Sequence, residues 1–205
     1  MNHIKAAFFD TQVNEVWAAS EYNETEIWKI KRMMDLASVF PGARIVEPGC
    51  GIGRLTRILS SAVGPYGHVL ACDISPAMID RCRLQTFDHD NVSFVCCGVE
   101  EYPLPDSSYD IVICHNVFPH FDDKELCARH LARALKQTGK FVVFHFHNSD
   151  WINDLHRKTH PCVFNDLIPD PLEMRRLLGA NGLSIDHFTD DENGYLLLAS
   201  FAGTN

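Results

Sequence analysis

The chain has 205 residues, of which 46% are hydrophobic and 22% charged, and its formal net charge is −9. This length suits one well-buried α/β domain, and the acidic balance argues against a protein that holds nucleic acid through its phosphates. No apolar run approaches the ~20 residues that span a bilayer, and the N-terminus lacks the apolar core of a signal peptide. We therefore expect a cytoplasmic protein with no membrane association, whose eight cysteines are buried free thiols.

Residues 1–40 are predicted to be helical and to form a cap that precedes the core. Their first half is aromatic and irregular, with Phe8, Phe9, Trp17 and Tyr22. Their second half carries an apolar stripe at helical spacing, with Asn23 or Thr25 as a possible N-cap: Ile27, Ile30, Met33, Met34 and Ala37.

The next stretch joins a short apolar strand to a helix through three glycines. The strand runs from Arg44 into Glu47, the glycines stand at positions 49, 51 and 53, and an apolar helix face begins at Leu55. A turn of this kind lets a ligand approach the backbone closely, and the helix start offers unpaired N–H groups. A dinucleotide fingerprint needs its third glycine where Arg54 stands, which disfavours an NAD(P)-linked oxidoreductase. Glu47 would repel a pyrophosphate but could pair with a cation.

The segment Glu47–Gly53 reads E-x-G-C-G-x-G and resembles motif I of the class I S-adenosylmethionine (SAM) methyltransferases. In that family the acidic residue neighbours the methionine moiety, and the glycine backbone packs against the cofactor. SAM carries a sulfonium and an ammonium and no phosphate, so the acid suits it. The resemblance implies cofactor contacts by Glu47, Gly49, Cys50 and Gly51. It also makes the aromatic N-terminal segment either a lid over the cofactor or a cover for a sheet edge.

A second strand, His68–Cys72, ends at Asp73, about twenty residues past the glycine turn. An acid in that position can accept both hydroxyl groups of an adenosine ribose, and the family uses it in that way. Ile74 would then lie against the adenine. The alternative is that Asp73 only caps a turn, since Ser75-Pro76 supplies the start of the following helix.

The third strand, Val92–Cys97, leads into a stretch that is similar to the family's G-D-A-x-x-L-P-F-x-D-x-S-F-D. Gly98 stands where the family has an adenine-binding aspartate, so Val99 would offer its backbone N–H instead. The resemblance adds Gly98, Val99 and Glu100 to the cofactor-binding residues, and His115 at the end of the fourth strand.

The remaining elements complete a doubly wound α/β sheet. We expect a strand at 110–115, a helix closed by Gly139 with Leu135 on its buried face, and a strand at 141–146. Two further strands, 183–188 and 195–201, suit a hairpin. The prediction is a mostly parallel seven-stranded sheet with an antiparallel C-terminal strand, the Rossmann-like methyltransferase fold. Residues 1–205 would form one domain, with 148–169 as a substrate-side insertion.

Histidines gather around the predicted carboxyl ends of the fourth and fifth strands. His145 and His147 would share a strand face, and His156 and His160 would share a helix face. Three interpretations stay open: a divalent metal site, a general base, or a polar pocket lining without proton transfer. A substrate-pocket role is favoured, with His147, His156 and His120 as catalytic candidates and His147 and His156 as the metal candidates.

The sequence therefore predicts a SAM-dependent methyltransferase that acts on a small molecule, with no nucleic-acid partner. An alternative is a SAM- and metal-binding protein with a regulatory or metal-handling role and no methyl transfer. Methylation of DNA or RNA is disfavoured because His115-Asn116-Val117-Phe118 stands where an N-P-P-Y-type sequence would be expected. The acceptor atom and the oligomeric state are left open.

Overall fold

The computed structural model describes residues 2–203, which divide into two compact units, residues 2–102 and residues 103–203. Seven strands follow the order β3-β2-β1-β4-β5-β7-β6 in one sheet, and this confirms the predicted fold class. The first three strands belong to the first unit and the other four to the second.

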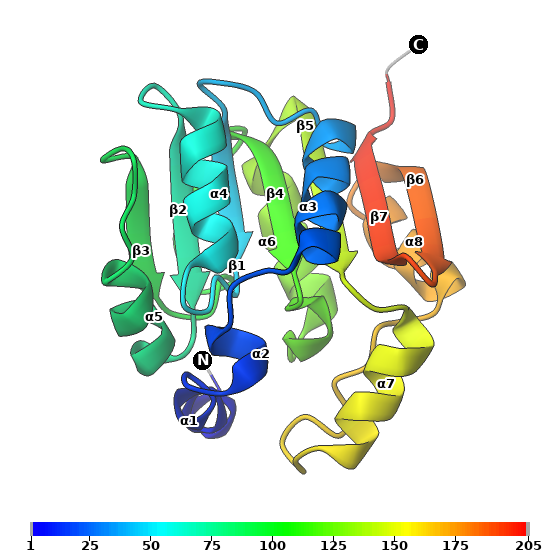
Figure 1. The fold of residues 1–205 in the computed structure, drawn as a ribbon. Helices are drawn as coiled ribbons and strands as arrows, with labels where there is room; N and C mark the ends of the chain where they lie inside the picture. The colour runs from blue at the N-terminus through cyan, green and yellow to red at the C-terminus, as the bar shows by residue number, and fades with distance from the viewer. Residues whose placement is uncertain (1, 204–205) are drawn as a thin grey trace. The chain divides into compact units, whose positions relative to one another are not determined.

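In residues 1–102, three parallel strands form the sheet: β1 (Arg44–Pro48), β2 (His68–Asp73) and β3 (Val92–Cys96). Pro48 pairs with Cys72 and Asp73 with Cys96, so the carboxyl ends of all three strands lie at one edge. Helix α4 (Arg54–Val63) packs on β2, and α5 (Pro76–Arg83) packs on β2 and β3 (Figure 1).

Three helices precede β1: α1 (His3–Thr11), α2 (Val16–Ala19) and α3 (Glu24–Leu36). Asn23 caps α3, because its side chain accepts from the Glu26 backbone while the Glu26 carboxylate accepts from the Asn23 backbone. Helix α1 packs against α5, as Figure 1 shows. The predicted N-cap at Asn23 and the helix start at Ser75-Pro76 are both confirmed.

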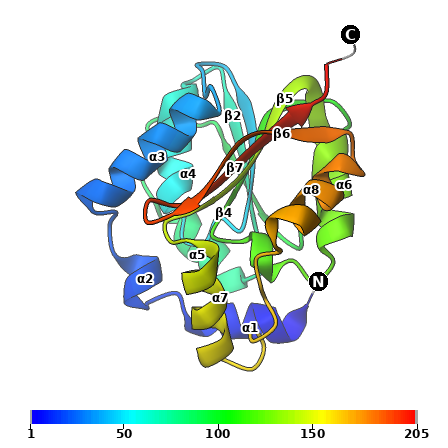
Figure 2. The ribbon, with the colours of Figure 1, turned by 90° about the vertical axis from the view of Figure 1, so that its right-hand side faces the viewer.

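In residues 103–203, β4 (Tyr109–His115) and β5 (Leu135–His145) are parallel, and β7 (Gly194–Phe201) runs antiparallel to β5 and to β6 (Leu183–Asp191). Between these strands lie η1 (Phe118–His120), α6 (Lys124–Ala134), α7 (Ser149–Lys158) and α8 (Pro171–Gly179). Helices α6 and α8 lie side by side, while α7 extends beyond the end of β5 (Figures 1 and 2).

Several expected boundaries in this unit were wrong. Helix α6 ends at Ala134, and Leu135 already belongs to β5, where it pairs with Tyr109. Residues 135–139, which were expected to close the helix, therefore belong to a long strand. The hairpin strands β6 and β7 also extend to Asp191 and Gly194, because their backbone pairing continues through polar residues.

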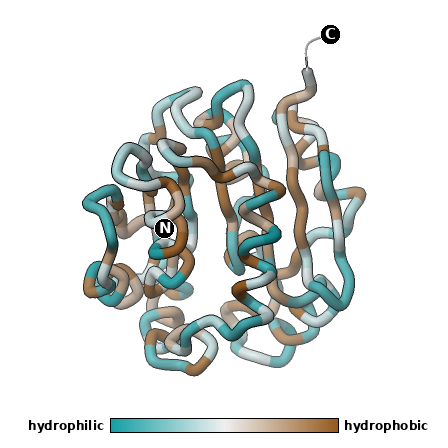
Figure 3. The backbone as a smooth tube through the Cα atoms, turned by 45° about the horizontal axis from the view of Figure 1, so that its top comes forward, coloured by the Kyte–Doolittle hydropathy of each residue, from teal (hydrophilic) through white to brown (hydrophobic). Residues whose placement is uncertain are grey.

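The central strands are largely apolar, and Figure 3 shows hydrophobic residues along extended segments of the chain. Val46, Ala71, Ile113 and Val142 are fully buried, as strands covered on both faces require. Within residues 2–203 none of the eight cysteines forms a disulfide, but Cys96 is exposed, because β3 is the edge strand of the sheet. Within residues 2–203, no helix is both long and apolar enough to cross a membrane.

Candidate functional site

The glycine turn between β1 and α4 depends on backbone angles that favour glycine. Gly49, Gly51 and Gly53 have φ values of 66°, 53° and 89°, and Gly53 is the N-cap of α4. The Cys50 N–H donates to the Cys72 carbonyl at 2.9 Å, which ties the turn to β2. A Cβ placed on Gly51 would meet no atom within 4 Å, so the space above this residue is open.

Two carboxylates lie beside the turn. Glu47 is 2% exposed, and its Oε2 atom is buried without a hydrogen-bond partner. Burial raises the pKa of Glu47 to about 8; the nearby Thr56 hydroxyl opposes the shift, and the charge of Asp73 adds to it. An acid held in this way favours its neutral form until a cation approaches, so the orphaned oxygen fits a positively charged ligand.

Asp73, at the end of β2, receives two backbone N–H groups. Gly51 donates to Oδ2 and Ser75 to Oδ1, each at 2.9 Å. Burial raises the pKa of Asp73 to about 6, although these N–H groups oppose the shift. Each carboxylate oxygen can accept a further hydrogen bond, so Asp73 retains capacity for ligand hydroxyl groups. The alternative role of a turn acid is also present, since Asp73 holds both the glycine turn and the next loop.

The other cofactor candidates of this unit follow the same strand ends. Ile74 is half-buried directly after β2, Val99 is 3% exposed after β3, and Gly98 and Glu100 flank Val99. A Cβ on Gly98 would come within 2.6 Å of the flexible Glu100 carboxylate. The predicted cofactor residues of this unit thus lie at or just after the carboxyl ends of β1, β2 and β3, which share one edge of the sheet.

Cys50 behaves as a packing residue. It is 6% exposed and lies in a cluster with Ala71, Ile79 and Cys82. A hydrogen bond with Cys82 and burial raise the pKa of the Cys50 thiol well above its usual value. A thiol that stays protonated is a poor nucleophile, so this residue offers no covalent chemistry.

The N-terminal segment is attached to the turn by a residue whose role the sequence did not predict. The Arg54 guanidinium donates to the Ser20 carbonyl at 2.6 Å and to the Trp17 carbonyl at 2.7 Å. It also lies over the Tyr22 ring, 4.3 Å from the centroid. A second tie comes from the Asp10 carboxylate, which accepts from the Ser75 hydroxyl at 2.6 Å. The sequence indicates Arg54 only as the residue that replaces a dinucleotide-fingerprint glycine.

In residues 103–203, two of the predicted histidines are buried at the ends of β4 and β5. His115 is 8% exposed and stacks on Phe144, with 4.9 Å between ring centroids. His145 is 3% exposed, and its Nε2 atom has no hydrogen-bond partner. Burial lowers the pKa of His145 well below its usual value, and the neighbouring histidines lower it further. His145 is therefore neutral.

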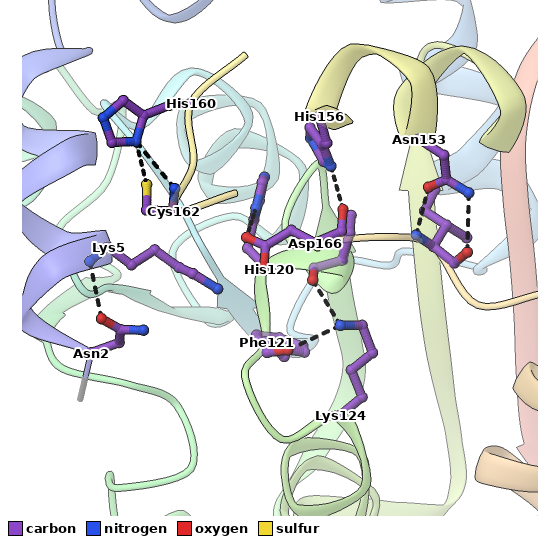
Figure 4. A network of polar contacts seen from close by, with 12 residues as sticks. Asn2, Lys5, His120, Phe121, Lys124, Asn153, His156, His160, Cys162 and Asp166 are labelled. Atoms are coloured by element: carbon purple, nitrogen blue, oxygen red, sulfur yellow. Dashed lines mark hydrogen bonds and ion pairs between the residues drawn. The ribbon is translucent and has the colours of Figure 1, made fainter. Parts of the chain in front are cut away.

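Figure 4 shows a second group, built from His120, His156 and Asp166. His120 Nδ1 lies 2.7 Å from Asp166 Oδ2, and His156 Nδ1 donates to the Asp166 backbone carbonyl. The two imidazole rings have centroids 4.7 Å apart. The structure thus brings together two of the three catalytic candidates, around an aspartate that no sequence pattern indicated.

The expected pairings of the other histidines were wrong. Strand β5 ends at His145, so the exposed His147 lies outside it and stacks on Trp151 at 3.8 Å. Helix α7 ends at Lys158, and His160 instead lies beside Cys162, 3.0 Å from its sulfur. Within residues 2–203, no three His, Cys, Asp or Glu side chains gather as a metal site. The metal assignment to His147 and His156 is therefore not supported.

Comparison with known proteins agrees with the geometry. Residues 46–143 match the family model of the methyltransferase domain. The ubiquinone/menaquinone biosynthesis C-methyltransferase UbiE of Hahella chejuensis (strain KCTC 2396) is 34% identical over 123 residues, which are 58% of this chain and 49% of that protein. Residues 46–143 are therefore similar to the methyltransferase domain, and the chain has the Rossmann-like methyltransferase fold.

Two further relatives define how far this similarity extends. UbiE of Ectopseudomonas mendocina (strain ymp) is 33% identical over 70% of this chain and 56% of its own length. The chain therefore spans about half the length of these curated relatives. A chain from the complex of a methyltransferase with the Haloferax volcanii Trm112 methyltransferase activator has a TM-score of 0.75 at 20% identity, over 94% of this chain and 96% of that one, and shows the shared fold.

Proposed function

We propose that the protein is a SAM-dependent methyltransferase that acts on a small molecule. The proposal is supported chiefly by the orphaned Glu47 oxygen, a buried acceptor beside an open glycine turn. A sulfonium and an ammonium supply the positive charge that would return Glu47 to its ionised form. Asp73 accepts hydrogen bonds in the position where the superfamily binds the ribose, and Gly98, Val99 and Glu100 would border the adenine.

When bound, SAM supplies an already activated methyl group. The chain then needs to orient the acceptor and to exclude water rather than to form a covalent intermediate. Glu47 and Asp73 would hold the two ends of the cofactor, and the Gly51 backbone would leave room for it. The inert Cys50 thiol is consistent with direct transfer.

The acceptor we propose is a small molecule rather than a nucleic acid. The net charge of −9 would repel a phosphate backbone. The UbiE relatives are named as C-methyltransferases of ubiquinone/menaquinone biosynthesis, and this favours an aromatic acceptor. Eight cysteines without a disulfide suit a reducing compartment, so a cytoplasmic location is part of the same proposal.

Calorimetric titration with SAM tests the cofactor assignment. Asp73→Asn should weaken binding about 10- to 100-fold, because a hydrogen bond to a charged acceptor contributes about 1.5–3 kcal/mol. Asp88→Asn makes the same chemical change at an exposed residue of the same unit and should leave the affinity unchanged. Saturable binding of NADH with no binding of SAM would refute the proposal.

A further inference from the structure

Two carboxylates stand on the same side of neighbouring strands beside the glycine turn. Glu47 of β1 pairs with Ala71 of β2, and Asp73 lies two residues further along β2. Paired residues of adjacent strands share a face of the sheet, and so do residues two apart on one strand, which places both acidic side chains on one face. Like charges in such a site oppose each other, so ionising both acids costs free energy.

Hydrogen bonds decide which of the two acids holds a proton before a ligand binds. Asp73 receives the N–H groups of Gly51 and Ser75, which favour its ionised form. Glu47 has only the nearby Thr56 hydroxyl to favour ionisation, and its buried Oε2 atom has no partner. Within residues 2–203, no lysine, arginine or histidine forms an ion pair with Glu47. A carboxyl buried in this way is neutralised by a proton, so Glu47 is the acid that carries it.

The other titratable groups around Glu47 in residues 2–102 supply no positive charge. Burial raises the pKa of Tyr22, just before α3, and of Cys72 on β2. A hydrogen bond with a neighbouring thiol and burial raise the pKa of Cys50 in the turn. All three groups are therefore neutral. The guanidinium of Arg54, at the start of α4, is directed to backbone carbonyls of the N-terminal segment and to the Tyr22 ring.

We propose that a cationic adenosine compound displaces the Glu47 proton when it binds, and that Glu47 thereby makes the site select positively charged over neutral ligands. The inference rests on the proposed function. The proton leaves the carboxyl O–H for the solvent, and the ionised acid then pairs with the positive charge beside the open Gly51 backbone. No bond within the ligand forms or breaks in this step.

This exchange makes the affinity for the cofactor depend on pH. Below the Glu47 pKa of about 8, part of the binding free energy is spent on removing the proton. The affinity for a cationic ligand should therefore rise about tenfold for each unit of pH, until the acid is ionised before the ligand arrives. A neutral adenosine compound gains nothing from the ionised acid, so its affinity should not change in this way.

The first test counts the protons released on SAM binding, by calorimetry of the full chain at pH 7 in buffers of different ionisation enthalpy. Asp73, with a pKa of about 6, is already mostly ionised at this pH. The wild type should release about one proton and Glu47→Gln none. Glu24→Gln makes the same change at an exposed carboxylate of the same unit and should behave as the wild type.

Three outcomes of this test would count against the proposal. SAM binding by the wild type without proton release would overturn the inference and leave the proposed function standing. Proton release that persists in Glu47→Gln would assign the proton to another group and would also overturn the inference. Absence of SAM binding by the wild type would overturn the proposed function, and the inference with it.

The second test needs only the wild type for its first part, and compares three adenosine compounds. SAM carries a sulfonium and an ammonium, S-adenosylhomocysteine an ammonium alone, and 5′-methylthioadenosine neither charge. Proton release with the first two compounds would identify the ammonium as the partner of Glu47, and release with SAM alone would identify the sulfonium. Either result supports the proposal. Equal proton release with 5′-methylthioadenosine would overturn it.

The second part of this test compares affinities in the wild type and in Glu47→Gln. The affinity for SAM should fall about tenfold or more in the variant, because the charged partner is lost, while the affinity for 5′-methylthioadenosine should stay the same. An equal fall for both compounds would show that Glu47 only shapes the site, and it would overturn the assignment of charge selectivity to this residue.

Discussion

Replacing Glu47 by glutamine should change how the stability of the protein depends on pH. The pKa of Glu47 is about 8 in the folded chain against an ordinary value of 4.5. Between these values the folded chain keeps a proton that the unfolded chain has lost, so the free energy of unfolding falls as the pH rises. This contribution is fully present below pH 4.5 and is lost as the pH rises through about 8.

The size of this change in the free energy of unfolding follows from the pKa shift of Glu47. A difference of about 3.5 units, at about 1.4 kcal/mol per unit, gives about 5 kcal/mol. Glu47→Gln cannot titrate, so its free energy of unfolding should rise relative to that of the wild type by about this amount between pH 4.5 and 8. Asp73 titrates in both proteins, so its contribution to the pH dependence of the free energy of unfolding largely cancels when the two are compared.

Urea unfolding at a series of pH values measures the difference, provided that both proteins unfold in one cooperative transition. Glu192→Gln is the matched control, because it makes the same change at an exposed carboxylate. The free energy of unfolding of this control should depend on pH in the same way as that of the wild type. A parallel profile for Glu47→Gln as well would show that the carboxyl is not held neutral by burial, and the reasoning about the cofactor site would fail with it.

Two further substitutions test the turn and its attachment to the N-terminal segment. Arg54→Ala should speed amide hydrogen exchange in residues 16–22 about 10-fold or more, because two hydrogen bonds from a charged donor are lost. The control Arg57→Ala removes only an exposed ion pair and should change the exchange rates little. Equal changes of the exchange rates in the two variants would contradict this account. Gly53→Ala should lower the free energy of unfolding by about 2–4 kcal/mol, since φ is 89° and the new Cβ would lie 2.5 Å from the Cys82 sulfur. Gly42→Ala, at φ 91° in open space, should cost only about 1 kcal/mol, and an equal loss in both would refute the clash.

The sequence predicted the strands and the glycine turn well because their signals are local. Buried parallel strands are continuous apolar runs, and the N-caps at Asn23 and Ser75 lie next to the helices that they start. The end of α6 was mispredicted for a related reason. Leu135 continues a helical apolar pattern, but its pairing with Tyr109 places it in β5, and this partner is distant in the sequence.

The parts of the site that could not be predicted depend on contacts between distant residues. Asp166 meets His120 across 46 positions, and Arg54 reaches Trp17 across 37. Neither pair can be recognised in the sequence from a periodic pattern or a motif, because the distance between the two residues of each pair depends on how the loops fold. The histidines were found by composition, but their partners were not, since the ends of β5 and α7 decide which of them face one another.

The position of Glu47 is explained better by function than by stability. A buried carboxyl oxygen without a partner costs the folded chain free energy, and an apolar residue of similar size would avoid that cost. In natural proteins, a buried polar group without a partner occurs mainly at functional sites, where a ligand supplies the missing interaction. A cation beside Glu47 would do so, because it converts an unfavourable buried acid into an ion pair. The same reasoning separates Glu47 from Asp73, whose two backbone hydrogen bonds give it a structural role even without a ligand.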